Sequence, residues 1–179
     1  MDKSVTKGRK ILTRESGTSL IETVVGLLIL TVGVVGVMGF LSIAVTQNWN
    51  QGDRSTRTTE YAQDKMEQLM ALSFSDASSN TTVYPTASTG GTGLGGAMSG
   101  STTVGSIAAG SPVTQYVDYI DASGVLTTNS TGALYSRQWS ITTNATATLK
   151  TISVVVRAMI QTTNGAAPPV TTLVSQKSQ

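Results

Sequence analysis

Residues 17–30 read GTSLIETVVGLLIL and residues 31–45 read TVGVVGVMGFLSIAV, and this stretch decides how the chain is built. Residues 20–45 hold 26 residues, of which Glu22 is the only charged one. As a helix, the uncharged part from residue 24 to residue 45 would span roughly 33 Å, about the thickness of a bilayer hydrocarbon core. A carboxylate this close to a membrane-length segment is costly unless it lies near the surface or is paired.

Charge is distributed unevenly around this stretch. Residues 1–17 contain five Lys or Arg against two Asp or Glu, a net charge of +3, whereas the rest of the chain has seven against eight, a net charge of −1. Because the basic residues precede the apolar run, the positive-inside rule places the N-terminus in the cytoplasm and the C-terminal body on the other side. The excess basic charge belongs to the N-terminal tail, so no nucleic-acid-binding surface is predicted.

Three interpretations of the N-terminal segment are open. A secretory signal peptide has an apolar core of about 7–15 residues, shorter than this run, and only Ser42-Ile43-Ala44 offers a weak cleavage site. A plain single-pass anchor explains the length and orientation but gives no role to Gly17 or Glu22. The third interpretation rests on the spacing of these two residues.

The run from Gly17 to Glu22 resembles the class III signal sequence of type IV prepilins and type II secretion pseudopilins. It combines a basic leader, a glycine, and a glutamate five positions later inside a membrane-length apolar run. The resemblance implies that a membrane aspartyl peptidase cleaves between Gly17 and Thr18, and that the new amine of Thr18 is methylated. The family most often has phenylalanine at the first mature position, where this chain has Thr18.

The resemblance also implies that Glu22, the fifth residue of the mature chain, acts in subunit assembly. Alone in an apolar bundle of helices its carboxylate would be costly, but paired with the amine of a neighbouring subunit it would be satisfied and would select the axial register. The implied partners are the prepilin peptidase/methyltransferase, other pilin subunits through the N-terminal helix, the inner-membrane assembly platform, and the inner membrane before assembly.

Four glycines, Gly26, Gly33, Gly36 and Gly39, interrupt the apolar run. Each costs up to about 1 kcal/mol in a helix relative to alanine. Glycine is common in membrane helices, so the four residues need no special role, and local unwinding during assembly is another option. We favour close helix packing, because small residues let two backbones approach each other.

Beyond residue 45 the pattern becomes amphipathic. Ala62, Met66 and Leu69 repeat at helical spacing, which predicts that the helix continues to about Phe74, with a kink near residues 48–52 as an option. Residues 61–69, YAQDKMEQL, are similar to a run found in minor pilins of the PilV type and their pseudopilin relatives. A helix with an apolar half and an amphipathic half fits a chain that anchors with one half and packs a head against the other.

The remainder of the chain favours a small β head. Residues 76–113 are rich in Gly, Ser and Thr and predict a long, mobile connection that buries little. Alternating patterns predict strands at residues 115–121, 125–126, 134–143, 150–161 and 170–174, with a hairpin at residues 144–148 and a polar tail at the end. On two of these strands the apolar residues share one face, namely Tyr135, Trp139 and Ile141, and Ile152, Val154, Val156, Ala158 and Ile160.

The predicted fold is therefore α+β, pilin-like, with a long N-terminal helix packed against a small antiparallel sheet. Its parts are a cleaved basic leader at residues 1–17, a transmembrane and polymerisation helix at 18–46 and an amphipathic continuation at 47–75. The Gly/Ser/Thr-rich connection follows at 76–113 and the sheet head with its polar tail at 114–179.

Several kinds of chemistry lack residues to carry them. The chain contains no cysteine and no histidine, which removes disulfides, thiolate nucleophiles, the commonest general base and the commonest metal ligand. Asp118 and Asp121 could be considered for calcium, but a turn explains Asp121 better. We therefore expect no catalytic residue, no metal site and no cofactor, and interpret the chain as a non-enzymatic minor pilin-like subunit. A type II secretion pseudopilin and a non-polymerising anchored binding module are the alternatives.

Overall fold

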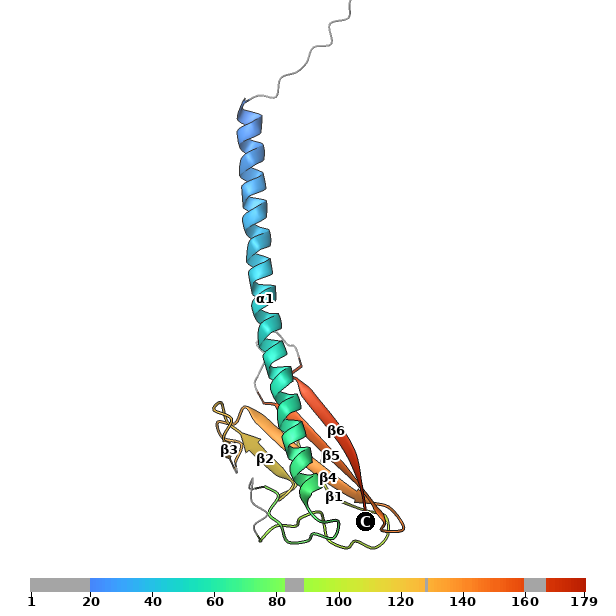
Figure 1. Cartoon of the computed structure of the whole chain (residues 1–179). Coiled ribbons are helices and arrows are strands. Elements are labelled where there is room, and N and C mark those ends of the chain that lie inside the picture. The colour runs from blue at the N-terminus through green and yellow to red at the C-terminus, as the bar shows by residue number, and fades with distance from the viewer. Residues whose placement is uncertain (1–19, 83–88, 128, 160–166) are drawn as a thin grey trace, which may run out of the picture. The chain divides into compact units, whose positions relative to one another are not determined.

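The computed structural model describes residues 20–82, 89–127, 129–159 and 167–179 of the 179-residue chain, and it divides into two compact units, Met1–Gln47 and Asn48–Gln179. The predicted cleavage site, Gly17 and Thr18, lies outside the described residues, as does Ile160. Figure 1 shows one helix, α1, followed by a sheet of strands β1 to β6. The α+β class predicted from the sequence is confirmed.

Helix α1 spans Leu20–Ala71 without interruption. It continues through residues 48–52, where the sequence suggested that a kink could occur, and it ends three residues before the expected Phe74. Beyond Ala71 the chain turns back on itself, with the Asp76 amide donating to the Ser73 carbonyl over 3.1 Å. The described part of the first unit consists of the apolar beginning of this helix, and the second unit contains the rest of it together with the sheet.

The head is an antiparallel six-stranded sheet in the order β3-β2-β4-β5-β6, with β1 also paired to β4. Its strands are β1 Thr102–Gly105, β2 Val117–Ile120, β3 Leu126–Thr127, β4 Tyr135–Thr143, β5 Leu149–Ala158 and β6 Val170–Ser178. The predicted hairpin at residues 144–148 joins β4 to β5. Asn144 closes it, because its side-chain carbonyl accepts from the amides of Thr148 and Leu149 at 2.9 and 3.0 Å.

The core lies between the second half of α1 and one face of the sheet, as the apolar faces predicted. Helix residues Ala62, Met66 and Leu69 are buried against the side chains of β2, β4 and β5, and the large contributors from these strands are Ile120, Tyr135, Trp139, Ile141, Ile152, Val154 and Val156. Tyr61 and Tyr135 pack edge to face, with ring centroids 5.2 Å apart. This packing makes the second half of α1 part of the core of the head.

The connection between helix and sheet differs from the prediction. It contains the strand β1 and the fully buried Leu94, so it is part of the folded head. Asp76 organises its beginning, since its carboxylate accepts from the Ser79 amide and hydroxyl at 2.9 and 2.7 Å. At Gly93, which has φ +50°, a side chain would overlap Asp76, so close packing explains this glycine.

The C-terminal residues differ as well. The sequence suggested a short strand ending at Val174 and then a polar tail, but β6 continues to Ser178 and pairs with β5 along its whole length. Residues on β6 alternate, so that Thr171, Leu173 and Lys177 face the helix. A tail was expected because polar residues replace the apolar ones after Val174, although backbone pairing does not depend on apolar side chains.

Candidate functional site

The beginning of α1 is an apolar surface that no other described residue covers. Residues 20–47 are exposed all around, and this is the one described helix that is long and apolar enough to cross a membrane. Two of its three threonines satisfy their hydroxyls within the helix: Thr31 and Thr46 donate to the carbonyls of Leu27 and Ser42, one turn back, at 2.7 and 2.9 Å. A segment of this kind is compatible with a transmembrane helix.

Glu22 lies in the first described turn of this segment, where its side chain is exposed. A carboxylate at a helix N-terminus is favoured by the helix dipole and by the unpaired amides of the first turn. Within the described residues Glu22 makes no ion pair. Its predicted partner is the Thr18 amine of a neighbouring subunit, so the structure of one chain does not test the pairing.

Within the described part of the chain, no close contact requires the four glycines of the segment. A side chain at Gly26, Gly33, Gly36 or Gly39 would meet no other atom within 4 Å. Gly33 also opens a shallow apolar depression on the helix surface, which is lined by Ile29, Leu30, Val34, Val37, Met38 and Leu41. A glycine at this place leaves the helix backbone uncovered, so a second helix could approach it closely. Its role therefore depends on whether a second helix or lipid contacts this surface.

The head contains a second distinctive cluster, made of buried charges. Asp118 on β2 stands opposite Arg137 on β4 in the sheet register, and Lys65 reaches both from α1. The Asp118 carboxylate accepts from Arg137 Nε and Nη2 at 2.7 and 3.0 Å and from Lys65 Nζ at 2.6 Å. All three side chains are at most 1% exposed.

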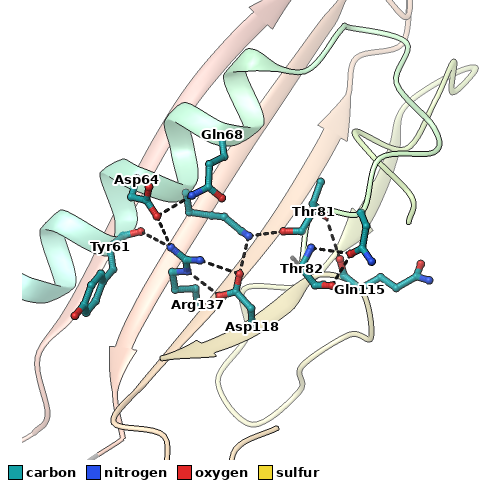
Figure 2. A network of polar contacts seen from close by, with 10 residues as sticks. Tyr61, Asp64, Gln68, Thr81, Thr82, Gln115, Asp118 and Arg137 are labelled. Atoms are coloured by element: carbon teal, nitrogen blue, oxygen red, sulfur yellow. Dashed lines mark hydrogen bonds and ion pairs between the residues drawn. The ribbon is translucent and has the colours of Figure 1, made fainter. Parts of the chain in front are cut away.

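Neighbouring groups complete this charge cluster, as Figure 2 shows. Arg137 Nη1 donates to Asp64 on the helix at 2.8 Å, and Gln68 donates to the same carboxylate oxygen at 2.7 Å. Lys65 Nζ also donates to the Thr81 carbonyl and lies 4.0 Å from the centre of the Trp139 ring. The cluster thus ties the helix to two strands and to the start of the connection.

Burial decides the proton affinities in this cluster. Desolvation lowers the pKa of Lys65 to about 8, although Asp118 acts in the opposite direction. For Arg137 burial alone would lower the pKa, but the charge of Asp118 and its hydrogen bonds outweigh burial and raise it. Arg137 therefore stays charged and holds Asp118, while Lys65 is the member whose charge is costly.

A third buried cation joins the helix end to the connection. Lys150 Nζ on β5 donates to the carbonyls of Phe74, Leu94 and Gly96 at 2.6, 2.9 and 2.7 Å. Burial lowers its pKa, and Asp76 opposes this effect. Lys177 on β6 donates to the Met70 carbonyl in the last turn of α1 at 2.6 Å. Lys177 thus satisfies a carbonyl of the last helical turn, which contains no basic residue of its own, whereas Lys150 satisfies carbonyls of the segment that follows the helix.

The two aspartates considered for calcium have other tasks. Asp118 belongs to the charge cluster, and Asp121 closes a turn, because its carboxylate accepts from the amides of Ser123 and Val125 at 2.8 and 2.9 Å. The turn predicted for Asp121 is confirmed. Within the ranges that the structure describes, no three acidic side chains are grouped as metal ligands are.

The sequence brought out Glu22 and the glycines but missed the charge cluster. Lys65 sits inside the stripe of Ala62, Met66 and Leu69, one helical turn before Leu69, and this position was its only signal. A lysine within an apolar stripe indicates a buried partner, yet its position alone does not say that the partner is Asp118, 53 residues later.

Comparisons with protein-family models, with curated proteins and with solved structures found no match to this chain.

Proposed function

We propose that this protein is a minor type IV pilin-like structural subunit, inserted in the bacterial inner membrane with its N-terminus in the cytoplasm. A prepilin peptidase cleaves it after Gly17, and the mature subunit enters a pilus or its priming and tip complex. The observation that carries this proposal is a membrane-length apolar helix with no partner among the described residues. Its first turn contains Glu22, Gly17 precedes it in the sequence, and a β head follows it.

Different residues act before and after assembly. Before assembly, residues 20–47 lie in the inner membrane and the head lies on the periplasmic side. Cleavage creates the amine of Thr18, which the peptidase then methylates. When the helix leaves the lipid for a bundle of like helices, Glu22 pairs with the Thr18 amine of a neighbouring subunit, and the glycines let the helices approach.

Two alternatives share parts of this proposal. A type II secretion pseudopilin would use the same leader, cleavage site and Glu22, so the two are separated by the machine that fails when the gene is deleted, through loss of piliation or loss of secreted enzymes. A single-pass anchored binding module would use the helix only as an anchor. It would retain residues 1–17 and would not polymerise.

The processing test compares three proteins produced in cells that contain a prepilin peptidase. The wild type and the control Gly8→Ala should both begin at Thr18, while Gly17→Ala should retain Met1. Gly8 also lies in the basic leader, so it controls for the loss of any leader glycine. Intact mass and N-terminal sequencing of the membrane fraction give the answer.

The outcomes separate the three interpretations of the N-terminus. Met1 retained in all three proteins would leave a single-pass anchor, and a new N-terminus near Ala44 would indicate a secretory signal peptide. If processing occurs, Glu22→Ala separates assembly from cleavage. The variant should still begin at Thr18 but should be missing from sheared filaments.

A further inference from the structure

Trp49 stands out in the second unit because its side chain is 76% exposed. The protein has only one other tryptophan, Trp139, which is fully buried in the head. Among the described residues of α1 beyond Trp49, no other large hydrophobic side chain is exposed. Single exposed hydrophobic residues are common on folded proteins, but this tryptophan closely follows an exposed apolar run of membrane length, so whatever surrounds that run is its candidate partner.

The position of Trp49 on the helix indicates what this partner is. The apolar run ends at Val45, and the polar residues Thr46, Gln47 and Asn48 follow. Four residues of helix advance about 6 Å, so the indole lies about 6 Å beyond the end of the apolar run. The headgroup layer on each side of a bilayer is about 5–8 Å thick, which is the difference between the full bilayer and its hydrocarbon core.

The chemistry of the indole fits this layer. Its ring is apolar and its N–H is a hydrogen-bond donor, which suits a region where lipid chains meet carbonyls and phosphates. We propose that Trp49 is a membrane-interface anchor, which lies among phospholipid headgroups on the side of the head and sets the depth of residues 20–47 in the bilayer. This inference goes beyond the proposed function and needs only the membrane segment.

The first test uses the fluorescence of the full, uncleaved chain in vesicles of phosphatidylethanolamine and phosphatidylglycerol. The vesicles contain phosphatidylcholine brominated either near the headgroup or near the chain ends. Shallow bromine should quench more strongly than deep bromine, and this quenching should disappear in Trp49→Phe, which retains the buried Trp139. Quenching no stronger than in Trp49→Phe would overturn the proposal, because the indole would then lie in water or against protein. Stronger quenching by the deep bromine would overturn it too.

The second test exploits the absence of cysteine from the chain. In Thr46→Cys the new thiol should be protected from a membrane-impermeant maleimide, and adding Trp49→Gln should raise its labelling severalfold because the helix is no longer held at its depth. Phe40→Leu is the matched control, since Phe40 is equally exposed in the apolar run but lies far from its end. Equal labelling with and without Trp49 would overturn the anchor. Both tests precede processing and assembly, so failure of cleavage at Gly17 would leave their result unchanged.

Discussion

In residues 20–47 the large apolar side chains are exposed and the one charge, Glu22, is exposed as well, whereas in the head Lys65, Asp118 and Arg137 are buried beside Trp139, Ile152 and Val154. The described part of the first unit exposes apolar side chains all around, which is compatible with a surrounding of lipid or of other helices. The second unit folds on itself and must satisfy each buried charge internally. Apolar and charged side chains are thus both exposed in the described part of the first unit, whereas in the second unit both kinds contribute to the interior.

The largest effect on the head should come from Asp118→Asn. The variant would leave Lys65 and Arg137 buried without their shared counter-charge, so we expect the free energy of unfolding to fall by about 3–5 kcal/mol. Urea unfolding of the full chain in detergent, followed by near-ultraviolet circular dichroism, measures the change.

Asp121→Asn is the matched control for Asp118→Asn. Asp121 lies three residues later in an exposed turn, where asparagine can accept the same amide hydrogen bonds. We expect a change below about 0.5 kcal/mol for this variant. An equal fall in the free energy of unfolding for both variants would mean that the charge cluster does not specifically stabilise the head. Membrane insertion should be normal in both, because it depends on residues 20–47.

The contrast between the two units also explains what could be predicted from the sequence. The apolar half of α1 was recognisable because consecutive residues determine its surface, and strand β5 was recognisable because Ile152, Val154 and Val156 alternate on one face. The charge cluster could not be predicted, because its members come from α1, β2 and β4 and meet only in the folded head. β1, the buried Leu94 and the end of β6 were missed for the same reason, since pairing and contacts distant in sequence hold them.

The second prediction concerns the pH dependence that the charge cluster confers. The pKa of Lys65 is about 8 in the folded head and 10.5 ordinarily, so the unfolded chain binds more protons between these values. Stability should therefore rise with pH from about 8 to about 10.5, by ~3 kcal/mol from this residue. The cost of burying charged Lys65 is fully present below pH 8 and disappears as the pH approaches 10.5.

Lys65→Met isolates this contribution, because every other titratable residue is the same in both proteins. The difference in free energy of unfolding between wild type and variant should favour the wild type increasingly as pH rises from 8 to 10.5. A difference independent of pH would show that Lys65 keeps its ordinary pKa in the head. Glu67→Met, an exposed change two residues away on α1, should show no pH-dependent difference.

The smallest effect should come from Lys177, in the stretch that the sequence suggested to be a polar tail. Its ammonium donates to the Met70 carbonyl at the end of α1, where a positive charge also interacts favourably with the helix dipole. Lys177→Met should lower the free energy of unfolding by about 1 kcal/mol. Gln176→Met is the control, because Gln176 is the neighbour of Lys177 on β6 but is exposed on the opposite face of the strand. If these residues were a tail, both changes would be neutral; a loss for Lys177 alone means that the C-terminal strand closes the end of the helix.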